Sequence, residues 1–282
     1  MYREVFWKSI RNLRLSLFIP DLYLLLVEMV LAFLFFKFTG LAALLTDPVF
    51  VAASIEDKIP LLRLFISENT LGLLIYFLIF VLTSFILGAS LNSMRYGMIR
   101  DVVFGDRYSF KQVMNYGVRF WPIVVVRLII FVFGIVTFLF VLGCYSILET
   151  YYPIPVTLFI VTFLVVAAIL FLKFLFLFTY AIMFLDHKGA LASVINSFAY
   201  FLRNKWYVFK VFLLILVLSA VLLPFELIFN YYQNALGLLS FYTILFFVVR
   251  GAASAFYNVW SEVLIFYSYA ARLLFPSGPS QL

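Results

Sequence analysis

Ionisable residues within apolar stretches are the part of this sequence that could carry chemistry. Glu28 and Arg250 each lie about ten residues, or ~15 Å of helix, inside a long apolar run. A charge at that depth in a membrane is costly unless it meets a partner or water. Because their depths match, we predict that Glu28 and Arg250 form an ion pair. Such a pair would either fix the packing of two helices or line a polar cavity or pathway.

Three further charged residues, Arg127, Lys173 and Glu262, lie nearer to the ends of their apolar runs. The side chains of Arg127 and Lys173 are long enough to reach the membrane interface with their charged ends. In the alternative interpretation, the three residues form a pocket between helices that binds the head group of an anionic lipid. We treat them as a candidate lipid head-group pocket.

Motifs of soluble enzymes do not occur in the sequence. It contains no Walker A motif, no G-x-G-x-x-G, no G-x-S-x-G, no H-E-x-x-H and no C-x-x-C. His187 is the only histidine and follows Asp186 in a short polar turn, whereas metal sites gather several ligands. The single cysteine, Cys144, excludes an intramolecular disulfide. We therefore predict no catalytic residue, no cofactor and no metal site.

The composition excludes a soluble globular protein. Apolar residues make up 66% of the chain and charged residues 12%, against about 25% charged in soluble domains. No stretch is polar enough, for long enough, to form a soluble domain, so we predict a single membrane domain over residues 1–282. The net charge of +7 then indicates membrane orientation and attraction to anionic lipid, with no nucleic-acid partner.

Long apolar runs predict an all-α, polytopic membrane protein with six transmembrane helices. Each run exceeds or approaches the ~20 residues that a helix needs to cross a bilayer. If the chain closes on itself, the first and last spans are neighbours, which would bring Glu28 close to Arg250. The expected spans are Phe18–Phe38, Thr70–Ser93, Trp121–Gly143, Pro155–Phe184, Trp206–Asn230 and Phe241–Leu274.

Lysine and arginine are divided unevenly between the two sides of these spans. Lys58 and Arg63 lie on the outer side, and a much larger set lies on the side of the N-terminus. Because cytoplasmic loops are enriched in these residues, we expect both termini in the cytoplasm of a multi-pass cell-membrane protein. The larger set is Arg3, Lys8, Arg11, Arg14, Arg95, Arg100, Arg107, Lys111, Arg119, Lys188, Arg203, Lys205, Lys210 and Arg272.

Three amphipathic stretches precede the odd-numbered spans, and we expect each to be an interfacial helix. In the second stretch, Ser109 and Gln112 have the spacing of a capping box. Together with the spans, these helices predict a pseudo-threefold internal repeat over approximately 1–101, 102–186 and 187–275. The first and third stripes are Phe6, Ile10, Leu13 and Leu17, and Leu191, Val194, Ile195, Phe198 and Leu202.

Two segments carry a resemblance to a known family: KSIRNLRLSLFIPDLYLLL near the N-terminus and YAIMFLDHKGALASVINSFAYFLRNKWYVFKVFLL at 180–214. They resemble a family of six-span proteins related to the membrane domain of some glycerophosphodiester phosphodiesterases. The shared pattern is a span ending in an acidic residue, a glycine turn, a helix with alanine and serine, and a new span. The resemblance implies a six-span fold without a catalytic domain, and no catalytic residues to carry over.

The function expected from the sequence is to bind or move a lipid or small amphiphile in an interhelical cavity. Glu28, Arg250, Arg127 and Lys173 would line that cavity. The alternatives are a non-catalytic structural or regulatory subunit of a membrane complex and, second, an intramembrane lipid-modifying enzyme. The partners would be membrane lipids, including anionic ones, and a protein partner or a second copy of the chain.

The proposed pair of Glu28 and Arg250 is testable by a double-mutant cycle. We expect Glu28→Gln and Arg250→Gln to be coupled by about 0.5–3 kcal/mol, because each single change leaves the other charge in an apolar environment. The measurement is the unfolding free energy of the protein in detergent. Strictly additive effects would show that the two side chains do not interact.

Overall fold

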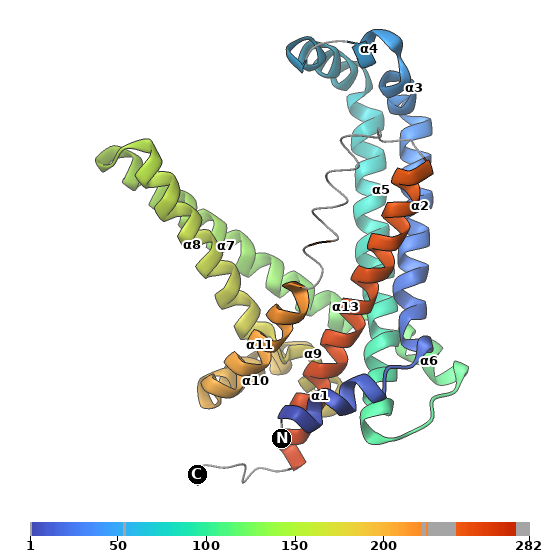
Figure 1. The fold of residues 1–282 in the computed structure, drawn as a ribbon, viewed down its shortest axis with the longest axis vertical. Coiled ribbons are helices and arrows are strands. Elements are labelled where there is room, and N and C mark those ends of the chain that lie inside the picture. Colours follow the sequence, from blue (N-terminus) through green and yellow to red (C-terminus); the bar gives the residue numbers. More distant parts are fainter. Residues whose placement is uncertain (1, 53–54, 221–223, 225–240, 275–282) are drawn as a thin grey trace.

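A computed structural model of the chain describes residues 2–52, 55–220, 224 and 241–274, and these ranges are helical with no strand. Long helices rise from a base where α1, α6, α9 and α10 gather, and Figure 1 shows them diverging into two arms. One arm contains α2, α5 and α13, and the other is the hairpin of α7 and α8. We call the end of the molecule with α1, α6, α9 and α10 the basal end.

Within residues 2–52 and 55–220 the helices follow one another with short connections. The main helices are α2 (Ile19–Phe38), α5 (Ile55–Phe104), α7 (Trp121–Tyr151), α8 (Ile154–Phe176), α11 (Lys205–Ala220) and α13 (Phe241–Leu274). The shorter ones are α1 (Tyr2–Arg11), the 3-10 turn Leu15–Phe18, α3 (Leu41–Thr46), α4 (Pro48–Ala52), α6 (Phe110–Val118), α9 (Thr179–Leu185) and α10 (Ala190–Arg203).

Four helical segments of the described chain are long and apolar enough to cross a membrane: Leu15–Phe38, Asp57–Phe104, Trp121–Tyr151 and Ile154–Leu185. They coincide with the first four predicted spans and indicate a membrane protein. The expected fifth span extends beyond Ala220, where it lies outside the described residues. The expected sixth span has the bounds of α13 but is not among the four. Six spans are therefore not confirmed.

The predicted fourth span is not one continuous helix. α8 ends at Phe176 and α9 begins at Thr179, so the chain bends between them. The Phe178 ring is buried at this bend, where it contacts two tyrosine rings. Ser197 on α10 donates a hydrogen bond of 2.7 Å to the Leu175 carbonyl, which satisfies a backbone acceptor at the break. Hydropathy alone carries no signal for such a break, because both sides of it are equally apolar.

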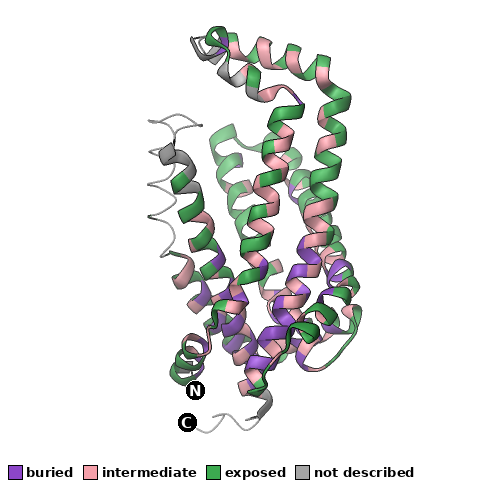
Figure 2. Cartoon of the chain, turned by 90° about the vertical axis from the view of Figure 1, so that its right-hand side faces the viewer, coloured by how far each residue is buried: buried purple, intermediate pink, exposed green. Residues whose placement is uncertain are grey.

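The buried core is concentrated at the basal end. Figure 2 shows the buried residues in purple gathered there, whereas the upper turns of the helices are mostly exposed. The exposed side chains of the upper turns are largely apolar, as expected for helices that face lipid. The structure therefore has a tightly packed base and apolar arms that a bilayer would cover.

Two of the three expected interfacial helices present apolar stripes outward. The capping box that opens α6 is confirmed: Ser109 and Gln112 exchange side-chain and backbone hydrogen bonds. The first predicted stripe, in contrast, turns toward the core: Phe6 and Ile10 on α1 are half-buried, and Leu17 in the following 3-10 turn is fully buried. The exposed apolar residues are Phe110, Met114 and Val118 on α6, and Leu191, Ile195, Phe198 and Leu202 on α10.

Close packing of α5 on α6 depends on two glycines. A Cβ at Gly97 would overlap the ring of Tyr116, and a Cβ at Gly117 would overlap the side chain of Met94. Small residues allow helices to approach this closely in membranes. The hydroxyl of Ser93 also donates to the Tyr116 carbonyl at 2.6 Å. The contact between these two helices is therefore fixed by both shape and hydrogen bonding.

We expect Gly97→Ala to destabilise the protein by about 1–3 kcal/mol, because the added methyl group displaces the Tyr116 ring. The matched control is Gly72→Ala on the same helix, where an added Cβ meets nothing within 4 Å. That change should be neutral or stabilise the helix by up to about 1 kcal/mol. The measurement is thermal unfolding in detergent, and equal effects of the two substitutions would contradict the packing argument.

Candidate functional site

A buried cluster of charges joins the beginning, middle and end of the chain. Arg95, near the end of α5, is only 4% exposed and lies between two carboxylates. One Nη atom of its guanidinium pairs with Asp21 in the first turn of α2. The Nε and other Nη atoms contact Glu262 of α13, at 2.6 Å to each carboxylate oxygen. The Nη contact is a hydrogen bond, whereas the Nε contact is an ion pair without hydrogen-bond geometry. Charge-assisted contacts of this kind between arginine and carboxylate are strong.

The local sequence explains why the carboxylates are available to Arg95. Asp21 lies in the first turn of α2, where the helix dipole favours a negative charge, and Pro20 beside it suits that first turn. Asp21 and Glu262 are 13% and 18% exposed, so neither has access to much water. One buried cation therefore offsets two partly buried anions, with the α2 dipole adding partial positive charge.

Aromatic rings extend the cluster toward the centre of the base. Tyr96 donates a hydrogen bond of 3.1 Å to Glu262. Its ring stacks on Tyr180 with centroids 4.8 Å apart and also contacts Phe184 and Phe266. Residues from α5, α9 and α13 thus meet at one side chain, which holds Glu262 in place from a second direction.

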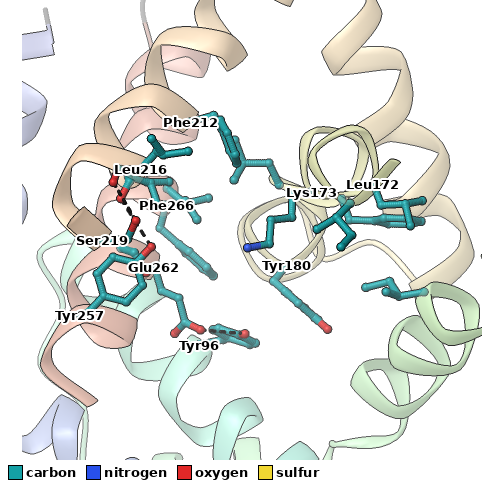
Figure 3. Close-up of a pocket in the computed structure, with 17 residues that line it drawn as sticks. Tyr96, Leu172, Lys173, Tyr180, Phe212, Leu216, Ser219, Tyr257, Glu262 and Phe266 are labelled. Carbon is teal, nitrogen blue, oxygen red and sulfur yellow. Dashed lines mark hydrogen bonds between the residues drawn. The ribbon is translucent and has the colours of Figure 1, made fainter. Parts of the chain in front are cut away.

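Glu262 and Tyr96 also face an interhelical cavity of about 470 Å³. Figure 3 shows Lys173 pointing into this space from α8, opposite Glu262 on α13. The remaining walls are mostly apolar and come from α7, α8, α11 and α13, with a few hydroxyl groups among them. They are formed by Ile130, Ile169, Leu172, Phe176, Leu177, Tyr180, Phe212, Ile215, Leu216, Ser219, Tyr257, Ser261, Ile265 and Phe266.

The cavity has the general character of a site for an apolar molecule with a polar end. Ligand sites of this kind have volumes of ~300–1,000 Å³, apolar walls and a few placed polar groups. Here the charged groups, Lys173 and Glu262, face each other from α8 and α13, and most of the remaining lining is apolar with hydroxyl groups such as those of Tyr180, Ser219 and Tyr257.

No known relative identifies the chain. Neither a family model, nor a curated protein, nor a solved structure matches it. The functional argument therefore depends on the geometry of the site.

The predicted head-group pocket is partly assembled in the structure. Lys173 and Glu262 line the same cavity. Arg127 lies beside it, near the Tyr180 hydroxyl, and donates a hydrogen bond of 3.0 Å to the Phe85 carbonyl on α5. Its guanidinium therefore reaches across to a neighbouring helix and does not extend to the interface as a snorkelling arginine would.

The first and last long helices are neighbours, as predicted. A Cβ at Gly251 on α13 would lie 2.8 Å from a methyl carbon of Leu25 on α2. This contact places Glu28, three residues further along α2, less than one helical turn from the level of Arg250. Both residues lie well above the cavity, since Arg250 is about three turns of α13 from Glu262. Their direct pairing stays a prediction.

The Arg95 cluster is the part of the site that sequence reasoning missed. Arg95 was expected to be a cytoplasmic loop cation, and Asp21 received no role. α5 instead continues as a helix to Phe104, which carries Arg95 into the base of the molecule. The signal available in the sequence was Glu262, an acidic residue late in an apolar run that required a cation.

We expect Arg95→Met to reduce the free energy of unfolding by about 3–5 kcal/mol, because it leaves two carboxylates buried without their cation. The triple variant Arg95→Met, Asp21→Asn, Glu262→Gln should recover most of the loss, since no uncompensated charge remains. Arg107→Ala, on an exposed loop, is the control and should change stability by less than about 0.5 kcal/mol. Denaturation in detergent tests this; a triple variant no more stable than Arg95→Met would contradict it.

Proposed function

We propose that this protein binds or moves a lipid or small amphiphile in the interhelical cavity. The observation that carries the proposal is the placement of Lys173 opposite Glu262 in a cavity whose other walls are mostly apolar. A negatively charged head group would be attracted to Lys173, with Arg127 close by. The chain of the ligand would extend along Ile169 and Leu216, where it would be shielded from water.

The cavity suits one end of a membrane lipid better than a water-soluble substrate. At about 470 Å³ it accommodates a head group or part of an acyl chain, not a whole phospholipid. It is partly open, so a longer ligand can extend out of it along the apolar helix surfaces that face the bilayer.

We further propose the membrane arrangement that this function requires. The fifth and sixth spans, Trp206–Asn230 and α13, complete a six-span protein with three repeats of one short helix followed by two spans. The element order is consistent with this, since α1, α6 and α10 each precede such a pair. Most of the basic residues lie at the basal end, which would face the cytoplasm together with both termini, in the cell membrane. The resemblance to the membrane domain of phosphodiesterases supports only this fold.

A structural or regulatory subunit is the second candidate function. The observation that favours it is the Arg95 cluster, which ties three helices together through two residues, Arg95 and Asp21, that do not line the cavity. In that function the charges fix the helix packing and the cavity has no specific ligand.

Lipid retention distinguishes the two functions. We expect Lys173→Gln to lower the amount of anionic lipid that copurifies with the protein several-fold, because the head group loses its cation. Leu216→Trp should reduce all cavity-bound lipid, since the larger ring occupies the apolar part of the site. Native mass spectrometry of protein released from nanodiscs measures both effects.

Lys111→Gln provides the matched control for this experiment. Lys111 is an exposed lysine on α6 at the basal end, outside the cavity, and its replacement removes the same charge. Lipid retention should be unchanged in this variant. If Lys173→Gln and Leu216→Trp also retain the wild-type amount of lipid, the proposal is wrong and the structural function is favoured.

A further inference from the structure

A second pocket, of about 350 Å³, lies at the basal end of the molecule and is separate from the interhelical cavity. It forms where three segments meet: the end of α5, the joint between α6 and α7, and the turn between α9 and α10. Four arginine, lysine or histidine side chains line it, namely Arg100, Arg119, His187 and Lys188. None of them lines the interhelical cavity.

The position of Arg100 in this pocket is fixed by its neighbours. Its guanidinium donates to Asp101 at 2.7 Å and to the Tyr116 hydroxyl at 2.8 Å. Tyr116 in turn donates to Asp101 at 3.0 Å, and its ring packs closely over Gly97. Burial and the hydrogen bond to Asp101 raise the pKa of the Tyr116 phenol, so it remains a neutral hydrogen-bond donor at neutral pH. This side of the pocket is preorganised by the same α5–α6 contact that the glycines allow.

The opposite side of the pocket supplies positive charge on exposed side chains. Arg119 and Lys188 are both exposed, on segments about seventy residues apart in sequence. His187 beside Lys188 adopts a left-handed conformation with φ of 53°, which sharply reverses the chain before α10. Two acidic residues beside the pocket have partners, because Asp101 binds Arg100 and Asp186 accepts a hydrogen bond of 2.8 Å from Tyr269. A third, Asp106, lies close enough to Tyr116 to act on it electrostatically, but it is exposed to solvent.

We propose that this basal pocket binds a phosphate group, either free in solution or in the head group of a phospholipid. Asp101 and Tyr116 hold the Nε and one Nη atom of Arg100, which leaves its other Nη atom to donate to a phosphate oxygen. Arg119 and Lys188 add the further donors and the positive charge that phosphate oxygens require. The Ser93 and Tyr116 hydroxyls lie in the same lining. Exposed apolar side chains on α6, including Phe110 and Val118, place this pocket at the level where lipid phosphates lie.

The test uses full-length protein in phosphatidylcholine nanodiscs and two ligands. Inorganic phosphate is titrated by calorimetry, and phosphatidate added to the discs is counted by native mass spectrometry. Arg119→Gln with Lys188→Gln should weaken binding of the phosphate ligand about tenfold or more, because two charge-assisted contacts are lost. Binding of inorganic phosphate identifies a site for a soluble anion, and binding of phosphatidate alone identifies a lipid site.

Arg203→Gln with Lys205→Gln is the control for non-specific attraction. Both residues are exposed at the basal end, in the joint between α10 and α11, and lie outside the pocket. This pair removes the same charge and should change the affinity by less than about twofold. Equal weakening by the two pairs, or no binding of either ligand to the wild-type protein, would overturn the proposal. Lys173→Gln should leave phosphate binding at the basal pocket unaffected, because Lys173 lines only the interhelical cavity. A negative result for the basal pocket can therefore be told apart from a negative result for the cavity.

Discussion

The fold depends most on the double contact of the Arg95 guanidinium with Asp21 and Glu262. Desolvating three charged side chains is expensive, and the cost is offset only when donor and acceptor geometry is close to ideal. That requirement constrains three helices at once, because α2, α5 and α13 each supply one partner. The contact thereby fixes the height of α2 and of α13, and the rotation of each about its own axis, relative to α5.

The basal core and the divergent arms follow from this constraint. At the basal end, side-chain hydrogen bonds from Ser93, Ser197 and Tyr207 to backbone carbonyls join neighbouring helices. Above it, the helix surfaces are largely apolar and exposed, and a bilayer supplies their surroundings. The interhelical cavity lies at the boundary between these regions. A pair of charged side chains within mostly apolar walls is the natural consequence of that position.

Sequence patterns predicted features that depend on local chemistry. The bounds of α13 and the capping box at Ser109 were correct, because apolar length and side-chain capping act within a few residues. The break at Phe178 was missed, since it depends on a hydrogen bond from Ser197 on another helix. Lys173 and Glu262, which were grouped from their depth alone, line one cavity. The sequence did not reveal the role of Arg95, because the second span was expected to end at Ser93, which placed Arg95 in a loop. α5 instead continues to Phe104.

The two proposed anion sites share a wall of aromatic rings. Tyr96 lines the interhelical cavity and Phe184 lines the basal pocket, and their ring centroids are 5.6 Å apart in an edge-to-face contact. Tyr96 cannot move without leaving Glu262, and Glu262 cannot move without leaving Arg95. A ligand that displaces Phe184 would therefore push on Tyr96, which is held in place by Glu262 and, through Glu262, by Arg95. Because these rings are held in place, the wall between the two sites should not move when either site is filled. The two sites should therefore keep their shapes independently.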